Sequence, residues 1–272
     1  MNRLFVAYKP SGVVSNHFLS RLKRKYGVKK AGFSGTLDPF AKGVLIIGFG
    51  SYTKLFRFLD KTPKRYRATL WLGLDSLSLD TENVQKVQKI SEFPLEKVKE
   101  ALFTCKGKLT YTPPIFSAKS IDGQRAYDLA REGKEVKLKE VTSTIYDVQL
   151  CHYRHPFVTF EVTVSEGTYV RSIGDMVAKK LGTFGSLSAL ERLCEGKFIY
   201  EDEKPLEIKK YLSLKENFYL GDAENIRFGR KLALEDFKIQ DEGTYFLDNE
   251  NFITIITIKE NKVKYELGRI EC

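Results

Sequence analysis

Runs of alternating or wholly apolar residues predict short strands in the first two thirds of the chain. The runs are Leu4 to Tyr8, Val44 to Phe49, Arg65 to Gly73, Thr144 to Leu150 and Val158 to Ser165. Arg65 to Gly73 has the period of two that is typical of a strand with one buried face. The last two runs follow one another closely, so we expect them to pair antiparallel.

Apolar residues at helical spacing predict helices between these strands. One helix begins at Ser15, whose hydroxyl can cap it, and ends at Gly27. Three more segments fit a helix, and they are Pro94 to Thr104, the stretch after Gly167 as far as Leu181, and Leu187 to Cys194.

The composition changes toward the end of the chain and predicts a second domain. Three short candidate strands, Gly243 to Leu247, Phe252 to Ile258 and Lys262 to Leu267, are separated by polar turns. We therefore expect a domain over residues 1–210 and a small β domain over residues 222–272. Within the first, residues 117–140 are polar and rich in Lys and Arg, with a short helical patch from Arg125 to Arg131, which predicts a mobile arm over a ligand.

Positive charge is concentrated at the start of the chain. The 272 residues carry a net charge of +10. Residues 1–70 hold fifteen Lys and Arg but only two acids, Asp38 and Asp60, whereas residues 201–272 hold twelve basic and sixteen acidic residues. A polyanion such as RNA is therefore expected to bind mainly to the N-terminal third.

Several functional classes are disfavoured by the composition. No apolar run approaches the ~18 residues of a membrane span, and the first residues lack the pattern of a secretory signal, so we expect a cytoplasmic protein with no membrane partner. The four cysteines are scattered, which argues against a disulfide or zinc framework. Cys151, His152 and His155 have no fourth ligand nearby, so no metal site is predicted.

The loop from Ala31 to Gly43 holds the candidate chemistry. It places one carboxylate, Asp38, among Gly and Pro residues in very basic surroundings, where an acid weakens phosphate binding. A carboxylate there is a candidate for chemistry on a nucleic acid. The alternative is a plain turn, because Asp before Pro favours turn initiation.

Ordered motifs along the chain favour the chemical interpretation. They are Lys9-Pro10-x-Gly12-x-x-Ser15, Gly32-x-x-Gly35-x-Leu37-Asp38-Pro39-x-Ala41-x-Gly43-x-Leu45, Lys64-x-Tyr66, Pro113-Pro114-x-x-Ser117-Ala118 and Gly167-Thr168-Tyr169-x-Arg171. With these five blocks the chain, over roughly residues 3–200, resembles the TruB family of tRNA pseudouridine synthases.

The resemblance implies a fold and a reaction. The expected fold class is α+β, a pseudouridine synthase fold with a mixed, mainly antiparallel central sheet and a small C-terminal PUA-like β domain. The expected activity is isomerisation of the uridine at the conventional position 55 in the T-arm of tRNA, after the base is flipped out of its stack. It implies the tRNA T-arm as partner, no cofactor, no metal and no obligatory protein partner, and a monomer is the default.

Individual roles follow from the matched motifs. Asp38 matches the catalytic aspartate, Tyr66 an active-site tyrosine that stacks on the uracil, and Arg171 the basic partner of the carboxylate. Tyr169 and Leu190 match residues that line the pocket. Lys9 and Lys64, from two of the blocks, are further candidates for substrate binding.

The chain departs from the family pattern at three places, one of them Ser120, where many members have Lys and this chain has its Lys one residue earlier, at Lys119. Many members have His where this chain has Phe33, which can stack on a displaced base but has no ring nitrogen. The segment from Ser76 to Asp80 keeps a hydroxyl and one acid but lacks another acid.

The sequence bears on three alternative functions. The first is a tRNA-binding chaperone without catalysis. The second is a synthase of another family acting on ribosomal RNA, although the Arg-Leu-Asp setting typical of those is absent around Asp38. The third is a metal-dependent phosphoesterase, which has no cluster of acids near Asp38 to support it.

Overall fold

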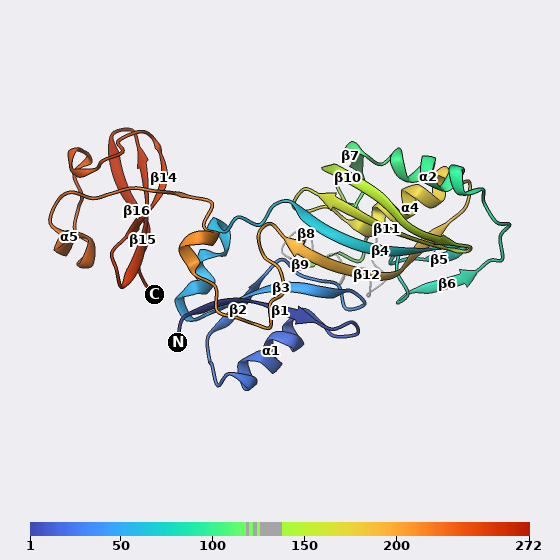
Figure 1. The fold of residues 1–272 in the computed structure, drawn as a ribbon, viewed down its shortest axis with the longest axis horizontal. Coiled ribbons are helices and arrows are strands. Elements are labelled where there is room, and N and C mark those ends of the chain that lie inside the picture. The colour runs from blue at the N-terminus through green and yellow to red at the C-terminus, as the bar shows by residue number, and fades with distance from the viewer. Residues whose placement is uncertain (118–119, 122–123, 126–137) are drawn as a thin grey trace.

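The computed structural model describes residues 1–117, 120–121, 124–125 and 138–272. Most of the predicted arm over residues 117–140, and nearly all of the predicted helical patch from Arg125 to Arg131, lie outside the described residues. Figure 1 shows a large mixed sheet with helices against it and a smaller sheet at the C-terminal end. None of the helices in the described ranges is long and apolar enough to cross a membrane.

Within the described residues, the central sheet has eight strands. They are β1 (Arg3–Lys9), β2 (Ala31–Ser34), β3 (Lys42–Phe49), β4 (Lys64–Leu72), β7 (Gly107–Tyr111), β10 (Val141–Arg154), β11 (Phe157–Val164) and β12 (Gly185–Glu195). Their order is β1-β3-β12-β4-β11-β10-β7, with β2 also paired to β3. Only β3 and β12 run parallel among these pairs. The prediction of a mixed, mainly antiparallel sheet is confirmed.

Strand β3 changes neighbour along one of its edges. β1 pairs with one edge over nearly the whole strand. On the other edge, β2 pairs with the end of β3, where Ser34 faces Ile46. β12 pairs with its beginning, where Arg192 faces Gly43. The loop of residues 35–41 leaves the sheet where β12 replaces β2, so Asp38 lies beside the centre of the sheet.

The two faces of β4 differ sharply. Lys64 and Tyr66 are buried on one face, whereas Arg65 and Arg67 are exposed on the other. Helices α2 (Leu95–Phe103) and α4 (Val170–Lys180) contribute to the buried core on the first face. Helix α4 packs closely on the sheet, because a Cβ on Gly174 of α4 would come within 2.8 Å of Leu187 on β12.

The predicted helix over Leu187 to Cys194 is wrong, since these residues belong to strand β12. The strand has irregularities between Leu187 and Ala189 and between Arg192 and Cys194. Each irregularity shifts the alternation of side chains by one position. Leu187 and Leu190 are therefore both buried although they are three residues apart, a spacing that imitates a helix.

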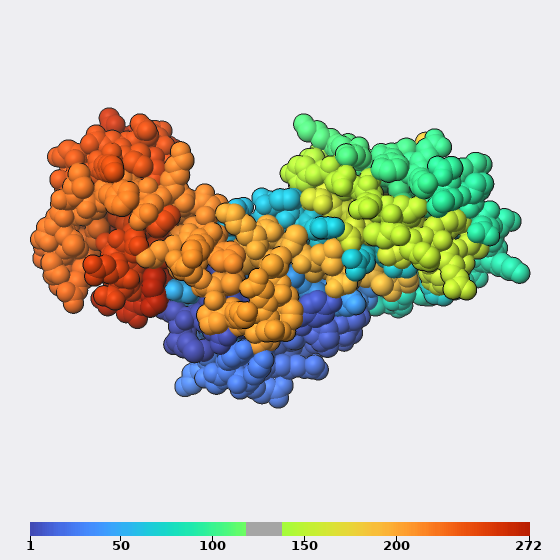
Figure 2. Space-filling view, in the orientation of Figure 1, coloured from blue at the N-terminus to red at the C-terminus, as the bar shows by residue number. Residues whose placement is uncertain are grey.

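The C-terminal sheet contains the three strands expected from the sequence. It consists of β13 (Lys215–Glu216), β14 (Gly243–Asp248), β15 (Phe252–Lys259) and β16 (Lys262–Glu271). Figure 2 shows it as a lobe at one end of the molecule. It is not independent of the first sheet, because Ile253 and Ile255 share a buried cluster with Leu4 and Ile46.

The remaining elements connect these two sheets or flank them. They are α1 (Ser15–Lys25), η1 (Gly50–Phe58), β5 (Leu74–Ser76), β6 (Val84–Val87), β8 (Ser120–Ile121), β9 (Gln124–Arg125), η2 (Ile208–Tyr211), α5 (Ala223–Arg227) and η3 (Leu234–Asp236). The helices predicted from Ser15 and from Pro94 are confirmed.

Candidate active site

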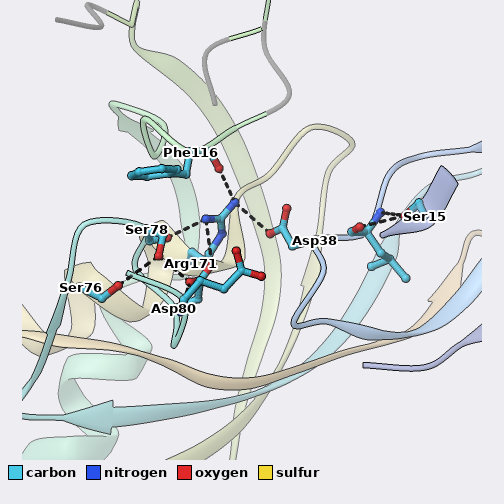
Figure 3. Close-up of polar contacts among 9 residues, drawn as sticks. Ser15, Asp38, Ser76, Ser78, Asp80, Phe116 and Arg171 are labelled. Carbon is cyan, nitrogen blue, oxygen red and sulfur yellow. Dashed lines mark hydrogen bonds and ion pairs between the residues drawn. The ribbon is translucent and has the colours of Figure 1, made fainter. Parts of the chain in front are cut away.

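The loop that carries Asp38 is fastened to the start of helix α1. Ser15, predicted to cap this helix, makes no capping hydrogen bond. Its hydroxyl instead donates to the carbonyl of Leu37 at 2.9 Å and accepts from the Leu37 amide at 3.2 Å (Figure 3). The predicted cap is therefore corrected: Ser15 fixes the backbone of the residue directly before Asp38.

Lys9 lies beneath the same loop and is fully buried. Its ammonium group donates to the carbonyls of Pro10 and Val13 at 2.9 and 2.7 Å and reaches Pro39 at 3.4 Å. Burial lowers the pKa of Lys9 to about 8, against the opposing effect of the Asp38 carboxylate. The sequence suggested substrate binding for Lys9, and the structure places it on backbone carbonyls below the surface.

Asp38 and Arg171 form an ion pair at the centre of the site. An Oδ2 atom of Asp38 lies 2.9 Å from Nη2 of Arg171, which sits in the first turn of α4 (Figure 3). The Arg171 side chain is 4% exposed and that of Asp38 is 35% exposed, so the carboxylate is the half of the pair that a ligand can reach. Desolvation raises the pKa of Asp38, which Arg171 opposes and Asp80 reinforces.

The guanidinium of Arg171 is held by further groups besides Asp38. It lies 3.2 Å from Oδ2 of Asp80, and it donates to the carbonyls of Ser78 at 2.6 Å and Phe116 at 2.9 Å. A planar guanidinium engaged on several sides has little freedom to turn. Arg171 can therefore hold the Asp38 carboxylate in one orientation.

Asp80 is a site residue that sequence reasoning did not assign. It is buried, and its Oδ1 accepts hydrogen bonds from the Ser78 hydroxyl at 2.5 Å and the Glu82 amide at 2.9 Å. Between Ser78 and Asp80, Leu79 adopts φ 58°, a left-handed conformation that a leucine rarely takes. This bend turns the Ser78 carbonyl and the Asp80 carboxylate toward the same arginine. The only signal was the acid retained in the departure from the family pattern.

A cavity of about 280 Å³ opens on one side of the ion pair. Its walls include most of the residues predicted for the site, namely Asp38, Lys64, Tyr66, Tyr169, Arg171 and Leu190. Tyr66 is 8% and Leu190 6% exposed, and they come from the adjacent strands β4 and β12. Tyr169 precedes α4 at its N-cap, where its amide donates to the Tyr111 hydroxyl. The structure thus brings these distant motifs together around one carboxylate.

Phe33 belongs to a second cavity, of about 370 Å³. Asp38 and Arg171 line both cavities, so the ion pair lies between them. Phe33 and Phe116 provide aromatic surface in the second cavity, and Asp80 lies in its wall. Phe33 therefore stands on the other side of the ion pair from Tyr66.

Metal ligands are not grouped in the described parts of the chain. Within them, no three His, Cys, Asp or Glu side chains are placed to hold a metal ion. One candidate from the sequence, His155, has its Nε2 atom 3.0 Å from the carbonyl oxygen of Ile90.

The chain shares its fold with chains of two solved complexes. The chain is similar to one in the crystal structure of a Cbf5-Nop10-Gar1 complex, with a TM-score of 0.68 and 17% identity over 99% of this chain and 84% of that chain. It matches a chain of the archaeal box H/ACA sRNP Nop10-Cbf5 complex equally well, with a TM-score of 0.68 over 98% and 85%. At this identity the likeness concerns the fold alone.

Sequence comparison identifies the family. Residues 23–170 match the model of the TruB family pseudouridylate synthase N-terminal domain. A tRNA pseudouridine synthase B of Sulfurimonas denitrificans is 63% identical over all of both chains. Those of Nitratiruptor sp. and Campylobacter jejuni are 54% and 53% identical, over 99% and 100% of this chain and 98% and 99% of theirs. The chain belongs to the TruB family.

Proposed function

We propose that this protein is a tRNA pseudouridine synthase that isomerises the uridine at position 55 in the T-arm of tRNA. The observation that carries the proposal is the Asp38 carboxylate, held 2.9 Å from Arg171 at a cavity with tyrosine walls. Relatives that align over the whole chain are named tRNA pseudouridine synthase B, which supports tRNA as the substrate.

The reaction needs a carboxylate and no external reactant. The bond from the ribose C1′ to N1 of uracil breaks and a bond from C1′ to C5 forms, while C5 loses a proton and N1 gains one. An ionised carboxylate can attack an electrophilic carbon or remove a proton. Because desolvation makes Asp38 more basic than an ordinary aspartate, it is suited to the proton transfer. Asp38 is the reacting side chain whether the reaction begins with attack on a carbon or with removal of a proton.

The walls of the first cavity suit a single flipped base. Tyr66 and Tyr169 offer aromatic faces, and Leu190 closes the apolar side. Stacking on aromatic side chains contributes ~1–3 kcal/mol per base, which offsets the few kcal/mol that extrusion costs. Tyr169 has its hydroxyl proton near neutral pH, as any tyrosine does, and burial raises its pKa further, so it can donate a hydrogen bond to a uracil carbonyl.

Phe33 is proposed to occupy the space that the extruded uridine leaves. Its position in the second cavity, across the ion pair from Tyr66, fits a wedge better than a wall of the uridine pocket. We expect Phe33→Ala to lower the rate of pseudouridine formation about 10-fold or more, since it removes a stacking surface worth ~1–3 kcal/mol. Phe33→Tyr, which keeps the ring, is the matched control. Equal rates for Phe33→Ala and the wild type contradict the wedge.

The function is tested with an unmodified T-arm hairpin and no added metal or nucleotide. The wild type should form one pseudouridine, at position 55, when the product is mapped. Asp38→Asn should bind the hairpin with similar affinity and form none. Binding by both proteins without any product supports a tRNA-binding chaperone instead, and unchanged modification by Asp38→Asn ends the proposed role of Asp38.

A further inference from the structure

A second group of buried charges lies behind the loop that carries Asp38. It consists of Arg192 and Glu195 on β12 and Lys64 on β4, whose side chains are 1%, 0% and 7% exposed. Glu195 lies 3.1 Å from the Lys64 ammonium and 3.4 Å from the Arg192 guanidinium. Charges this deeply buried are costly to desolvate and cannot serve solubility, so another role is expected for these three side chains.

Arg192 fastens the start of the catalytic loop to the sheet. Its Nε atom donates to the Val44 carbonyl at 2.8 Å and its Nη2 atom donates to the Gly35 carbonyl at 2.9 Å. Gly35 lies three residues before Asp38, whereas the contacts from Ser15 hold the residue next to it. One guanidinium therefore bridges strand β3 and the loop.

Glu195 contributes charge rather than hydrogen bonds. Within the described residues, neither of its carboxylate oxygens has a hydrogen-bond partner, although both face cations. Replacing a buried ion pair by apolar residues is often neutral or stabilising, so stability does not explain this group. Its evident effect is to hold Arg192 and Lys64 in place from one point.

At Gly35 the loop packs directly against Glu195 and Arg192 and leaves no space for a side chain. Gly35 has φ +68°, and a Cβ there would lie 3.1 Å from Oε1 of Glu195 and 3.3 Å from Nη1 of Arg192. The position therefore requires glycine both for its backbone conformation and for its contact with the charged pair.

We propose that Arg192 is a positioning residue for the pseudouridine synthase reaction: held by Glu195, it fixes the Gly35 carbonyl and thereby sets where Asp38 stands at the first cavity. The inference rests on the proposed function, in which Asp38 is the reacting carboxylate. Asp38 is then held from two sides, by Arg171 at its carboxylate and by Arg192 through its backbone. A small displacement of a reacting group lowers the rate strongly even when the substrate still binds.

The test compares two identical substitutions on opposite faces of the sheet. Arg192→Lys keeps the charge beside Glu195, but an ammonium lacks the fork that reaches two carbonyls. Arg67→Lys makes the same change at a half-exposed arginine on β4. With the unmodified T-arm hairpin, we expect Arg192→Lys to lower kcat about 10- to 100-fold with KM and Kd within about threefold. Arg67→Lys should stay within about twofold of the wild type.

A second pair of variants keeps the proposal testable if Arg192→Lys does not fold. Gly35→Ala perturbs the Arg192 contact from the loop side. Gly27→Ala introduces the same kind of backbone strain, at φ +63°, where a Cβ would meet nothing within 4 Å. We expect kcat to fall about 10- to 100-fold in Gly35→Ala and to stay near the wild-type value in Gly27→Ala.

Four results separate this inference from the proposed function. A folded Arg192→Lys protein with kcat within twofold of the wild type overturns the positioning role, and so does a loss that lies wholly in Kd, because Arg192 then acts in RNA binding. If Asp38→Asn is inactive in the same experiment, the proposed function still stands. If the wild type itself forms no pseudouridine, the proposed function fails first.

Discussion

Arginine–carboxylate pairs occur on both faces of the central sheet, and they do different things. On the exposed face, Arg65 and Arg67 both pair with Glu161, and the two arginine side chains remain about half exposed, at 52% and 50%. On the other face, Arg171 is 4% exposed and pairs with Asp38 and Asp80. The Glu161 side chain between them is only 10% exposed, but its two cations are open to water, and an ion pair with solvent-exposed cations contributes little. Beneath the loops, the buried ion pair fixes the orientation of the Asp38 carboxylate. Its burial does not make the folded state correspondingly more stable.

The largest expected effect comes from removing the buried arginine. Arg171→Met removes the guanidinium that pairs with both Asp38 and Asp80, so the free energy of unfolding should fall by about 3–5 kcal/mol. The rate of pseudouridine formation should fall about 10³-fold or more, since the carboxylate loses both its orientation and its charge partner. Arg67→Met on the exposed face should cost less than about 1 kcal/mol. Urea unfolding measures the change in stability, and single-turnover kinetics measure the rate. Equal losses in Arg171→Met and Arg67→Met contradict the contrast between the buried and the exposed ion pairs.

The second prediction concerns the pH dependence of the rate. Activity should rise with pH as Asp38 ionises, at a pH above the ordinary range for aspartate because its pKa is raised. It should fall again above pH 8, up to tenfold per pH unit, as Lys9 loses its proton and its hold on the carbonyl of Pro39 weakens. Lys9→Arg, which does not titrate there, should remove the upper limb.

Unfolding of the protein does not account for the expected decline in activity above pH 8. The pKa of Lys9 is lowered in the folded protein, so the unfolded chain binds more protons between about pH 8 and the ordinary lysine pKa of 10.5. Its contribution to stability therefore increases with pH in that window. If activity falls while the unfolding midpoint stays constant or rises, the loss is a local event at the loop. If the decline in activity above pH 8 is unchanged in Lys9→Arg, another group causes it.

Sequence reasoning found the residues that local motifs carry and missed those that the fold brings in from elsewhere. Asp38, Tyr66 and Arg171 stand in short blocks with a family resemblance, and they share one cavity. Asp80 and Glu195 act through contacts with residues far away in the chain, which no spacing reveals.

Two local predictions failed for the same kind of reason. Leu187 to Cys194 imitates a helix because two irregularities in β12 place residues three apart on one face. Ser15 has a hydroxyl at the right place for a cap, but the neighbouring loop offers it the amide and carbonyl of Leu37. In both cases tertiary contacts override a local preference, and such contacts cannot be read from a window of residues.

A smaller effect is expected on the stability of the folded protein when Asp38 is replaced. Because desolvation raises the pKa of Asp38, its ionised form is disfavoured by folding, and stability should fall as pH rises from the ordinary aspartate pKa through the raised one. Asp38→Asn should therefore be at least as stable as the wild type at pH 7, and the difference should vanish near pH 3. Thermal unfolding over this range measures it. A less stable Asp38→Asn protein at pH 7 shows that the ion pair with Arg171 has a net stabilising effect.

The smallest effect, and the opposite pH dependence, is expected on the exposed face. Partial burial opposes the ionisation of Glu161, but hydrogen bonds from Arg67 and Arg65 outweigh it and hold its pKa below the usual range. Its contribution to stability is therefore present at neutral pH and lost as pH falls through that lowered pKa. Glu161→Gln should cost less than about 1 kcal/mol at pH 7, less still in high salt, and leave the rate within twofold. If instead Glu161→Gln lowers the free energy of unfolding as much as Arg171→Met, burial does not explain the difference between the ion pairs on the two faces.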